Sequence, residues 1–305
     1  MTLIVIEKII EMFVIVIIGV LAYKSGLIDK STTTKLSNLL LMLISPLLIF
    51  QSYQMDFDIK LLYGLLVTIL ASSITFVCCI ILSHFVLKGD EEKNPIEKIA
   101  VIYSNCAFIG IPLINGVLGS EGVFYMTAYT TVFNVLFWTH GVWVMSGDKK
   151  MGDVWKNLLT PAIVAVIIGL CFFILQIRLP DFIDKPVEMI ANMNTPLAMI
   201  IAGANLAQGN ILKSLKIKKL YFISFFKLIL IPLVGITILK IMSLNFNISF
   251  TVFIALACPA GATTIMFAQR YEKDTYYAAN IFVFTTVLSA ITIPVLTPFA
   301  TLILK

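Results

Sequence analysis

Ten apolar runs, each about as long as a membrane-spanning helix, constrain this chain more than any other feature. A bilayer core about 30 Å thick needs roughly 20 apolar residues of helix, and each run meets that length. Only 13% of the residues are charged, about half the share usual in soluble domains. We expect an all-α polytopic membrane protein with ten transmembrane helices. The runs lie near residues 4–23, 36–54, 60–87, 97–118, 122–145, 158–177, 187–208, 218–242, 248–269 and 275–303.

The basic residues between the runs predict the orientation. If the N-terminus lies outside, 15 of the 22 Lys and Arg residues fall in or beside inside loops and six fall outside, while Lys227 lies within a run. Inside loops of membrane proteins carry an excess of positive charge. We therefore expect a multi-pass protein of the plasma or inner membrane with both termini outside. The net charge of +5 then reflects orientation beside membrane lipid, and no nucleic-acid partner is expected.

Short motifs recur in the same order in the two halves of the chain. Ser45-Pro46-Leu47 corresponds to Thr195-Pro196-Leu197, and Thr130-Thr131-Val132 to Thr285-Thr286-Val287. Each half has five runs, an odd number, so the second half must enter the membrane from the opposite side. This predicts a 5+5 inverted repeat of the kind found in many secondary transporters. We expect a first repeat at 1–147, an inside loop at 148–157 and a second repeat at 158–305.

The fourth and ninth runs are interrupted near their middles, around Ser104-Asn105 and around Cys258-Pro259. Proline removes a backbone donor and glycine loosens the chain, so both positions favour broken helices. Backbone groups freed in this way cannot face lipid and must be buried or line a wet cavity. Two breaks at matching places in the halves therefore point to a transporter site. For either break alone, an ordinary helix kink is the alternative.

A half-helix that begins inside the membrane presents unpaired N–H groups and a partial positive charge, which suits a carboxylate. Asn105 adds donors and an acceptor, and Thr263 and Thr264 add hydroxyls. We predict as substrate-binding residues Ser104, Asn105, Cys106, Pro259, Ala260, Gly261, Thr263, Thr264 and Pro46. Residues expected to support coupling or the crossing are Asn134, Gly110, Pro112 and Asn194. Asn134 is either a partner of Asn105 or part of an interhelical hydrogen bond.

Charged and metal-binding side chains are sparse inside the runs. No aspartate or glutamate lies deep in one, so coupling through a buried carboxylate is not expected. Sodium held by neutral oxygens, proton coupling and uncoupled exchange all remain open. The five cysteines lack metal-ligand spacing, so neither a metal nor a cofactor is expected. For Lys227 we expect snorkelling toward the interface, with attraction of an anion as the alternative.

The two interrupted runs also carry a family resemblance. Asn105, Gly110 and Pro112 form the pattern N-x(4)-G-I-P, which resembles the fourth span of the auxin efflux carrier family. Pro259, Phe267-Ala268 and Tyr271 are similar to its ninth span, and Pro46-Leu47-Leu48 to its second. The chain looks like the prokaryotic branch of this family, within the bile acid/sodium symporter-like superfamily.

The resemblance implies a scaffold domain of helices 1, 2, 6 and 7 and a transport domain of helices 3–5 and 8–10. In the transport domain, broken helices 4 and 9 cross, and an elevator-like motion carries the site across the membrane. The resemblance also implies a homodimer and a small carboxylate substrate, malate-like, malonate-like or auxin-like. One departure stands out: plant auxin exporters have a proline immediately before the asparagine of span four, where this chain has Ser104.

These features together predict a secondary transporter of small organic anions. An enzyme is not expected, because no nucleophile with a base, paired carboxylates or metal cluster is visible in the runs. A channel, or a receptor or scaffold that does not transport, remains the alternative. Paired helix breaks in one chain with two halves favour the carrier over these.

Overall fold

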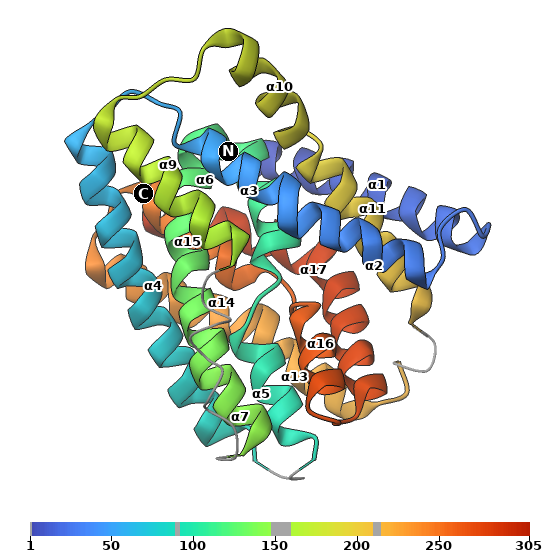
Figure 1. Cartoon of the computed structure of the whole chain (residues 1–305). Helices are drawn as coiled ribbons and strands as arrows, with labels where there is room; N and C mark the ends of the chain where they lie inside the picture. Colours follow the sequence, from blue (N-terminus) through green and yellow to red (C-terminus); the bar gives the residue numbers. More distant parts are fainter. Residues whose placement is uncertain (1, 89–91, 148–159, 210–214) are drawn as a thin grey trace.

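The computed structural model describes residues 2–88, 92–147, 160–209 and 215–305. Within these ranges the chain is built of helices and their connections, and its one extended feature is an isolated bridge between Ser104 and Ala260 (Figure 1). The all-helical prediction is confirmed for this part of the chain. The predicted inside loop 148–157 lies outside the described residues.

The helices follow one another with short connections. The N-terminal half contains α1 (Thr2–Lys24), α2 (Lys30–Leu39), α3 (Ser45–Ser52), α4 (Ile59–Val86), α5 (Asn94–Ile102), α6 (Ile111–Leu136) and α7 (Val142–Ser146). The C-terminal half contains α9 (Pro161–Leu175), α10 (Asp181–Ala191), α11 (Asn194–Gln208), α13 (Lys218–Phe225), α14 (Ile231–Met242), α15 (Phe246–Ala257), α16 (Thr263–Arg270) and α17 (Thr275–Leu304). Four π-helical turns join some of them: η1 (Leu40–Ile44), η2 (Cys106–Gly110), η3 (Phe137–Gly141) and η4 (Phe226–Leu230).

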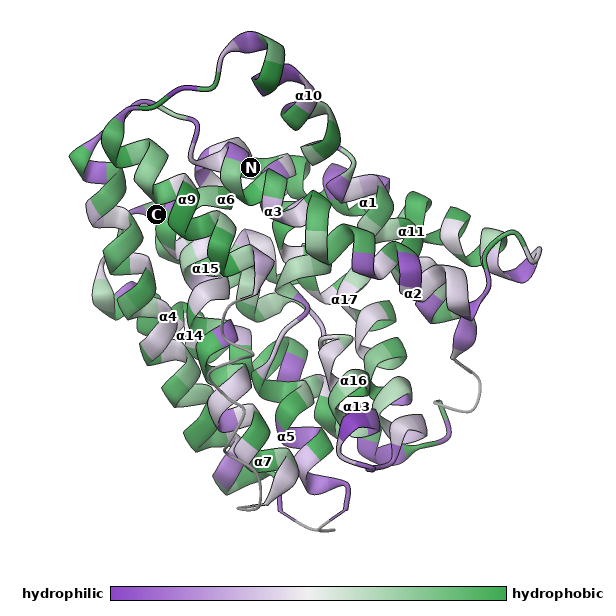
Figure 2. Cartoon of the chain, in the orientation of Figure 1, coloured by the Kyte–Doolittle hydropathy of each residue, from purple (hydrophilic) through white to green (hydrophobic). Residues whose placement is uncertain are grey.

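The outer faces of the long helices are apolar. Along α17, Ile291 and Val295 are each 64% exposed and Leu302 is 80% exposed, a spacing that places them on one face of the helix. The interior instead buries hydroxyl side chains, among them Ser72 on α4 and Thr251 on α15. Figure 2 shows hydrophilic residues gathered at helix ends and connections. This distribution suits a bundle whose solvent is lipid.

Five continuous helical stretches in the described part of the chain are long and apolar enough to cross a membrane. They are Lys30–Ser52, Ile59–Val86, Cys106–Ser146, Lys218–Met242 and Thr275–Leu304. The fourth and ninth predicted runs do not qualify as single helices because each is interrupted, at α5–η2 and at α15–α16. The protein is therefore a multi-pass membrane protein in which some helices are broken.

Three of the four π turns have a common cause. Pro46, Pro112 and Pro232 each lie two residues beyond the end of a π turn. Proline has no N–H, and its ring clashes with the carbonyl four residues earlier, which falls inside the π turn. Widening that turn from the α to the π form relieves the clash and lets the helix continue. The proline positions thus bend these helices without ending them.

Glycines set two further features. Gly119 interrupts α6 with φ 63° and ψ −150°, a conformation essentially reserved for glycine, and the predicted runs 97–118 and 122–145 meet there. Gly203 on α11 faces the backbone of α1, where a Cβ atom would clash with the Val16 carbonyl oxygen. The backbones of these two helices therefore lie in direct contact, which a glycine at position 203 makes possible because it has no side chain.

The seventh predicted run, 187–208, is not one helix. It is divided between α10 and α11 at Asn192 and Met193. Pro196 explains the division, because it lacks the N–H that a helix continuing from α10 would need, and the first turn of a helix is where proline fits best. Here it lies in the first turn of α11. The predicted continuous span was wrong at this point.

A buried carboxylate ties three helices together. Glu97, in the first turn of α5, is only 4% exposed and accepts a hydrogen bond of 2.8 Å from the Tyr277 hydroxyl of α17. The Lys219 ammonium of α13 lies 3.4 Å from its other oxygen. Sequence reasoning did not single out this residue, because neither partner is near it in the chain.

The α1–α11 contact predicts the effect of a substitution. Gly203→Ala would place a methyl group against backbone atoms of Val16 and Val20, which cannot rotate away. We expect it to destabilise the folded protein by about 1–3 kcal/mol, the usual cost of overpacking, measured as a lower unfolding temperature in detergent. Ile17→Ala is the control, because Ile17 is 57% exposed on the outer face of α1. A loss no larger in Gly203→Ala than in this control would contradict the packing described.

Candidate functional site

The two interrupted helices meet at their breaks. The Asn105 backbone N–H donates to the Pro259 carbonyl at 2.8 Å, and the Gly261 N–H donates to the Tyr103 carbonyl at 3.1 Å. These two bonds flank Ser104 and Ala260, which form a one-residue antiparallel bridge. Backbone groups that the helices cannot satisfy therefore satisfy one another. Two segments about 150 residues apart in the sequence are joined at this crossing.

Side chains from two other helices bond to the bridge. The Ala260 N–H donates to the Thr285 hydroxyl of α17 at 3.2 Å. On the other strand, the Lys227 ammonium of η4 donates to the Ser104 hydroxyl at 2.6 Å. Both Thr285 and Lys227 are fully buried. Side chains from the C-terminal half of the chain thus bond to both strands of the bridge.

Small side chains let the broken segments approach. A Cβ atom on Gly110 would lie 3.3 Å from the Cys258 sulfur and 3.3 Å from the Cys106 Cβ atom, so a larger residue would crowd the contact between η2 and the end of α15. Cys106 and Cys258 are both buried. Gly110 therefore permits Cys106 and Cys258 to pack closely at the crossing.

The half-helix that follows the second break offers free hydroxyl groups. Thr263 and Thr264 begin α16, and neither side-chain oxygen has a hydrogen-bond partner among the described residues. Thr264 is fully buried. A buried hydroxyl without a partner is costly, whereas the backbone N–H groups of Thr264, Ile265 and Met266 are already paired with the Gly261 and Ala262 carbonyls. A ligand with acceptor oxygens would satisfy both hydroxyls.

The Asn105 side chain is also available. It is 4% exposed, and its amide makes no hydrogen bond with any described residue, whereas its backbone oxygen accepts from the Ile109 N–H at 3.0 Å. The residue has φ −78° and ψ 48°, outside the helical region. Its backbone is therefore committed to the crossing while its side chain is left to bind.

The remaining predicted residues lie apart from the bridge. Asn134 donates to the Thr130 carbonyl of its own helix at 2.8 Å, which is neither the partnership with Asn105 nor the interhelical hydrogen bond that were the two alternatives. The Ser45 hydroxyl donates to the Asn194 side-chain oxygen at 2.7 Å, which joins α3 to α11. Pro46 follows Ser45 in the first turn of α3, and Pro112 lies in the first turn of α6. These prolines shape the helices rather than bond to the crossing.

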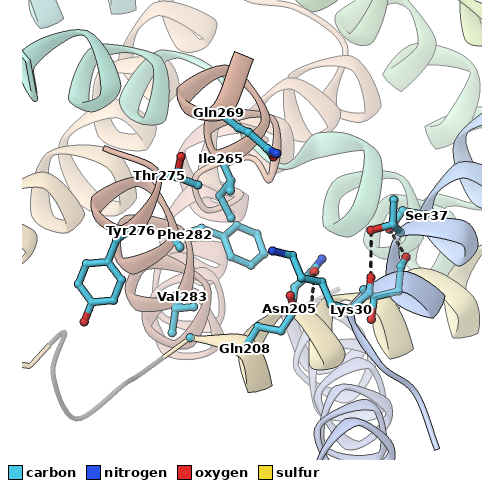
Figure 3. A pocket seen from close by; sticks show the side chains of 14 residues that line it. Lys30, Ser37, Asn205, Gln208, Ile265, Gln269, Thr275, Tyr276, Phe282 and Val283 are labelled. Carbon is cyan, nitrogen blue, oxygen red and sulfur yellow. Dashed lines mark hydrogen bonds between the residues drawn. The ribbon is translucent and has the colours of Figure 1, made fainter. Parts of the chain in front are cut away.

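A cavity of about 330 Å³ opens beside α16. Figure 3 shows Lys30 and Asn205 on one side of it and Ile265 and Gln269 of α16 on the other. Its lining is rich in hydroxyl and amide groups: Lys30, Thr33, Thr34, Ser37, Asn205, Gln208, Gly209, Ile265, Gln269, Thr275, Tyr276, Ala279, Phe282 and Val283. Helix α16 thus begins beside the break at Thr263 and lines this polar cavity with Ile265 and Gln269.

The structure corrects the expectation for Lys227. Its side chain does not snorkel: the residue is 0% exposed and its ammonium points to the crossing. A charged residue inside an apolar run is itself a signal of function. Thr285 was noted only as part of a repeated motif, since nothing in the sequence indicates that it faces Ala260.

A lipid-facing helical bundle that buries two paired, interrupted helices has the architecture of a membrane transport protein. The chain belongs to the auxin efflux carrier family: the family model, described as membrane transport protein, matches residues 4–154 and 150–297. The chain is also 21% identical, over 296 residues, to a Methanocaldococcus jannaschii protein named as an uncharacterized transporter. That match covers 92% of this chain and 94% of the relative. These findings place it among membrane transport proteins.

The bond between Thr285 and Ala260 can be tested with a neighbouring control. Thr285→Val keeps the side-chain shape but leaves the Ala260 N–H buried without an acceptor, which we expect to cost about 1–3 kcal/mol of stability. Thr286→Val is the matched control, because the Thr286 hydroxyl is buried and has no partner among the described residues. Thermal unfolding in detergent measures both. Equal losses in the two variants would count against the bond.

Proposed function

We propose that this chain is a secondary transporter of small organic anions, mono- or dicarboxylates of malate-like, malonate-like or auxin-like kind. The observation that carries the proposal is the pairing of Ser104 with Ala260. It brings the start of α16, with the free Thr263 and Thr264 hydroxyls, to the same crossing as Asn105, whose side-chain amide makes no hydrogen bond to a described residue. Donors at such helix ends suit a carboxylate.

The local charge supports an anion rather than a cation. The charged side chain bonded to the crossing is the ammonium of Lys227, and no carboxylate lies within ion-pair distance of it in the described part of the chain. Glu97, the buried carboxylate of α5, is instead engaged by Tyr277 and Lys219. A site with donors and a positive charge disfavours metal cations and cationic substrates.

We further propose ten spans in a 5+5 inverted repeat with two domains. The scaffold would comprise α1, α2–α3, α9 and α10–α11, and the transport domain α4, α5–α7 and α13–α17. The close glycine contact of α1 with α11 and the Ser45–Asn194 bond support the first group. The bridge between Ser104 and Ala260 supports the second group, because both of its segments belong to the proposed transport domain. The polar cavity, lined from α2 and α11 and from α16 and α17, would then lie between the domains.

An elevator-type movement follows from this division. The transport domain would slide against the scaffold and carry the bound anion from one side of the membrane to the other, which is alternating access by a rigid-body shift. A homodimer joined through the scaffold, and termini on the outside, are proposals supported by the family resemblance and by the basic loops. Coupling to sodium or protons is a separate question, answered by comparing substrate binding in sodium and choline buffers at several pH values.

The site predicts the consequence of removing one side chain. Asn105→Ala should weaken binding of malonate or malate at least about tenfold, or about 1.4 kcal/mol, because the amide donors are lost. Isothermal titration of the purified protein, together with its unfolding temperature, measures affinity and folding separately.

Asn247→Ala is the matched control for that variant. Asn247 lies in the first turn of α15, at the end of the helix opposite the break, so substrate binding should stay unchanged. An Asn105→Ala protein that is folded and binds as tightly as the unmodified protein would refute the site.

A further inference from the structure

Lys227 is the most deeply buried charged residue of the described chain. The residue is 0% exposed, and its ammonium makes one hydrogen bond to a described residue, with the Ser104 hydroxyl at 2.6 Å. An ammonium group has three N–H donors. One neutral acceptor leaves most of its hydrogen-bonding capacity and all of its charge uncompensated.

The surroundings do not balance this charge. The titratable groups in electrostatic range of the ammonium are the thiols of Cys79 on α4, Cys106 on η2 and Cys258 at the end of α15. A neutral thiol is a weak hydrogen-bond partner. A buried ammonium without a counter-ion costs several kcal/mol, and an anion bound near it would offset that cost.

Ser104 connects the ammonium to the substrate region. Its oxygen accepts from Lys227, which leaves its own O–H to donate to another group. The next residue is Asn105, and the opposite strand of the bridge holds Ala260. A hydroxyl that already accepts from a cation is a stronger donor, since linked hydrogen bonds polarise one another. The positive charge of Lys227 can therefore act on a bound carboxylate through Ser104.

We propose that Lys227 is the charge-selecting residue of this carrier: its ammonium, relayed by the Ser104 hydroxyl, is the counter-ion of the bound carboxylate. Lys227 positions and polarises Ser104 and does not itself contact the substrate. This inference rests on the proposed function. It adds the requirement that selectivity for a charged over a neutral ligand depends on Lys227.

The test compares a charged ligand with its neutral analogue. Malonate and malonamide have the same carbon skeleton, and isothermal titration of the full-length protein in lipid nanodiscs gives the affinity for each. We expect Lys227→Gln to lower malonate affinity at least about tenfold while malonamide affinity changes little, so the preference for malonate collapses. Lys227→Arg should restore part of that preference. Lys240→Gln, an exposed lysine on α14, should leave both affinities unchanged.

A second variant keeps the proposal testable if Lys227→Gln does not fold. Ser104→Ala retains the ammonium but removes the relay, and we expect it to reduce the preference for malonate as well. An unchanged preference in a folded Lys227→Gln or Ser104→Ala protein overturns the inference, as does an equal loss of both ligands. If the unmodified protein binds neither malonate nor malonamide, the proposed function fails together with the inference. If the unmodified protein binds malonate and only the variants depart from the expected result, the inference about Lys227 fails and the proposed function stands.

Discussion

The requirement that every backbone polar group be paired inside a membrane governs this structure. A continuous helix meets it by itself, but a broken helix does not. Here the two broken segments meet it jointly, because the Asn105 and Gly261 N–H groups bond to carbonyls of the opposite segment. The rest of the bundle positions this crossing. Without it, two interrupted helices would leave unpaired groups in an apolar interior at a cost of several kcal/mol each.

Several elements of the fold serve that arrangement. Pro112 and Pro232 are accommodated by the π turns η2 and η4 rather than by helix ends, and η4 is the turn that carries Lys227 toward Ser104. Gly110 leaves room for Cys258 beside η2. Thr285 completes the second strand. The crossing therefore combines backbone pairing, a buried charge and small residues, whereas lipid contact is left to the apolar stripes of helices such as α17.

The sequence predicted the parts of this structure that depend on local chemistry. Apolar run lengths indicated the helices, and Pro259 and the Ser104-Asn105 step indicated where two of them break. The matching order of motifs also indicated that the breaks correspond. Residues defined by partners far along the chain were missed: Lys227 was expected at the interface and Glu97 was not singled out. For Asn134 neither of the two alternatives is seen, because its amide bonds within its own helix. The run 187–208 was read as one helix because its hydrophobicity outweighed the effect of Pro196.

We propose that the paired breaks form a carboxylate site that alternates between the two sides of the membrane. Counterflow in proteoliposomes tests it most directly, with labelled malonate outside and unlabelled malonate inside. A site that alternates in this way should give uptake that saturates with external malonate and accelerates when malonate is present inside. Flux that rises linearly with concentration and ignores internal malonate would contradict it and indicate a channel, and absence of any protein-dependent flux would favour a receptor or scaffold.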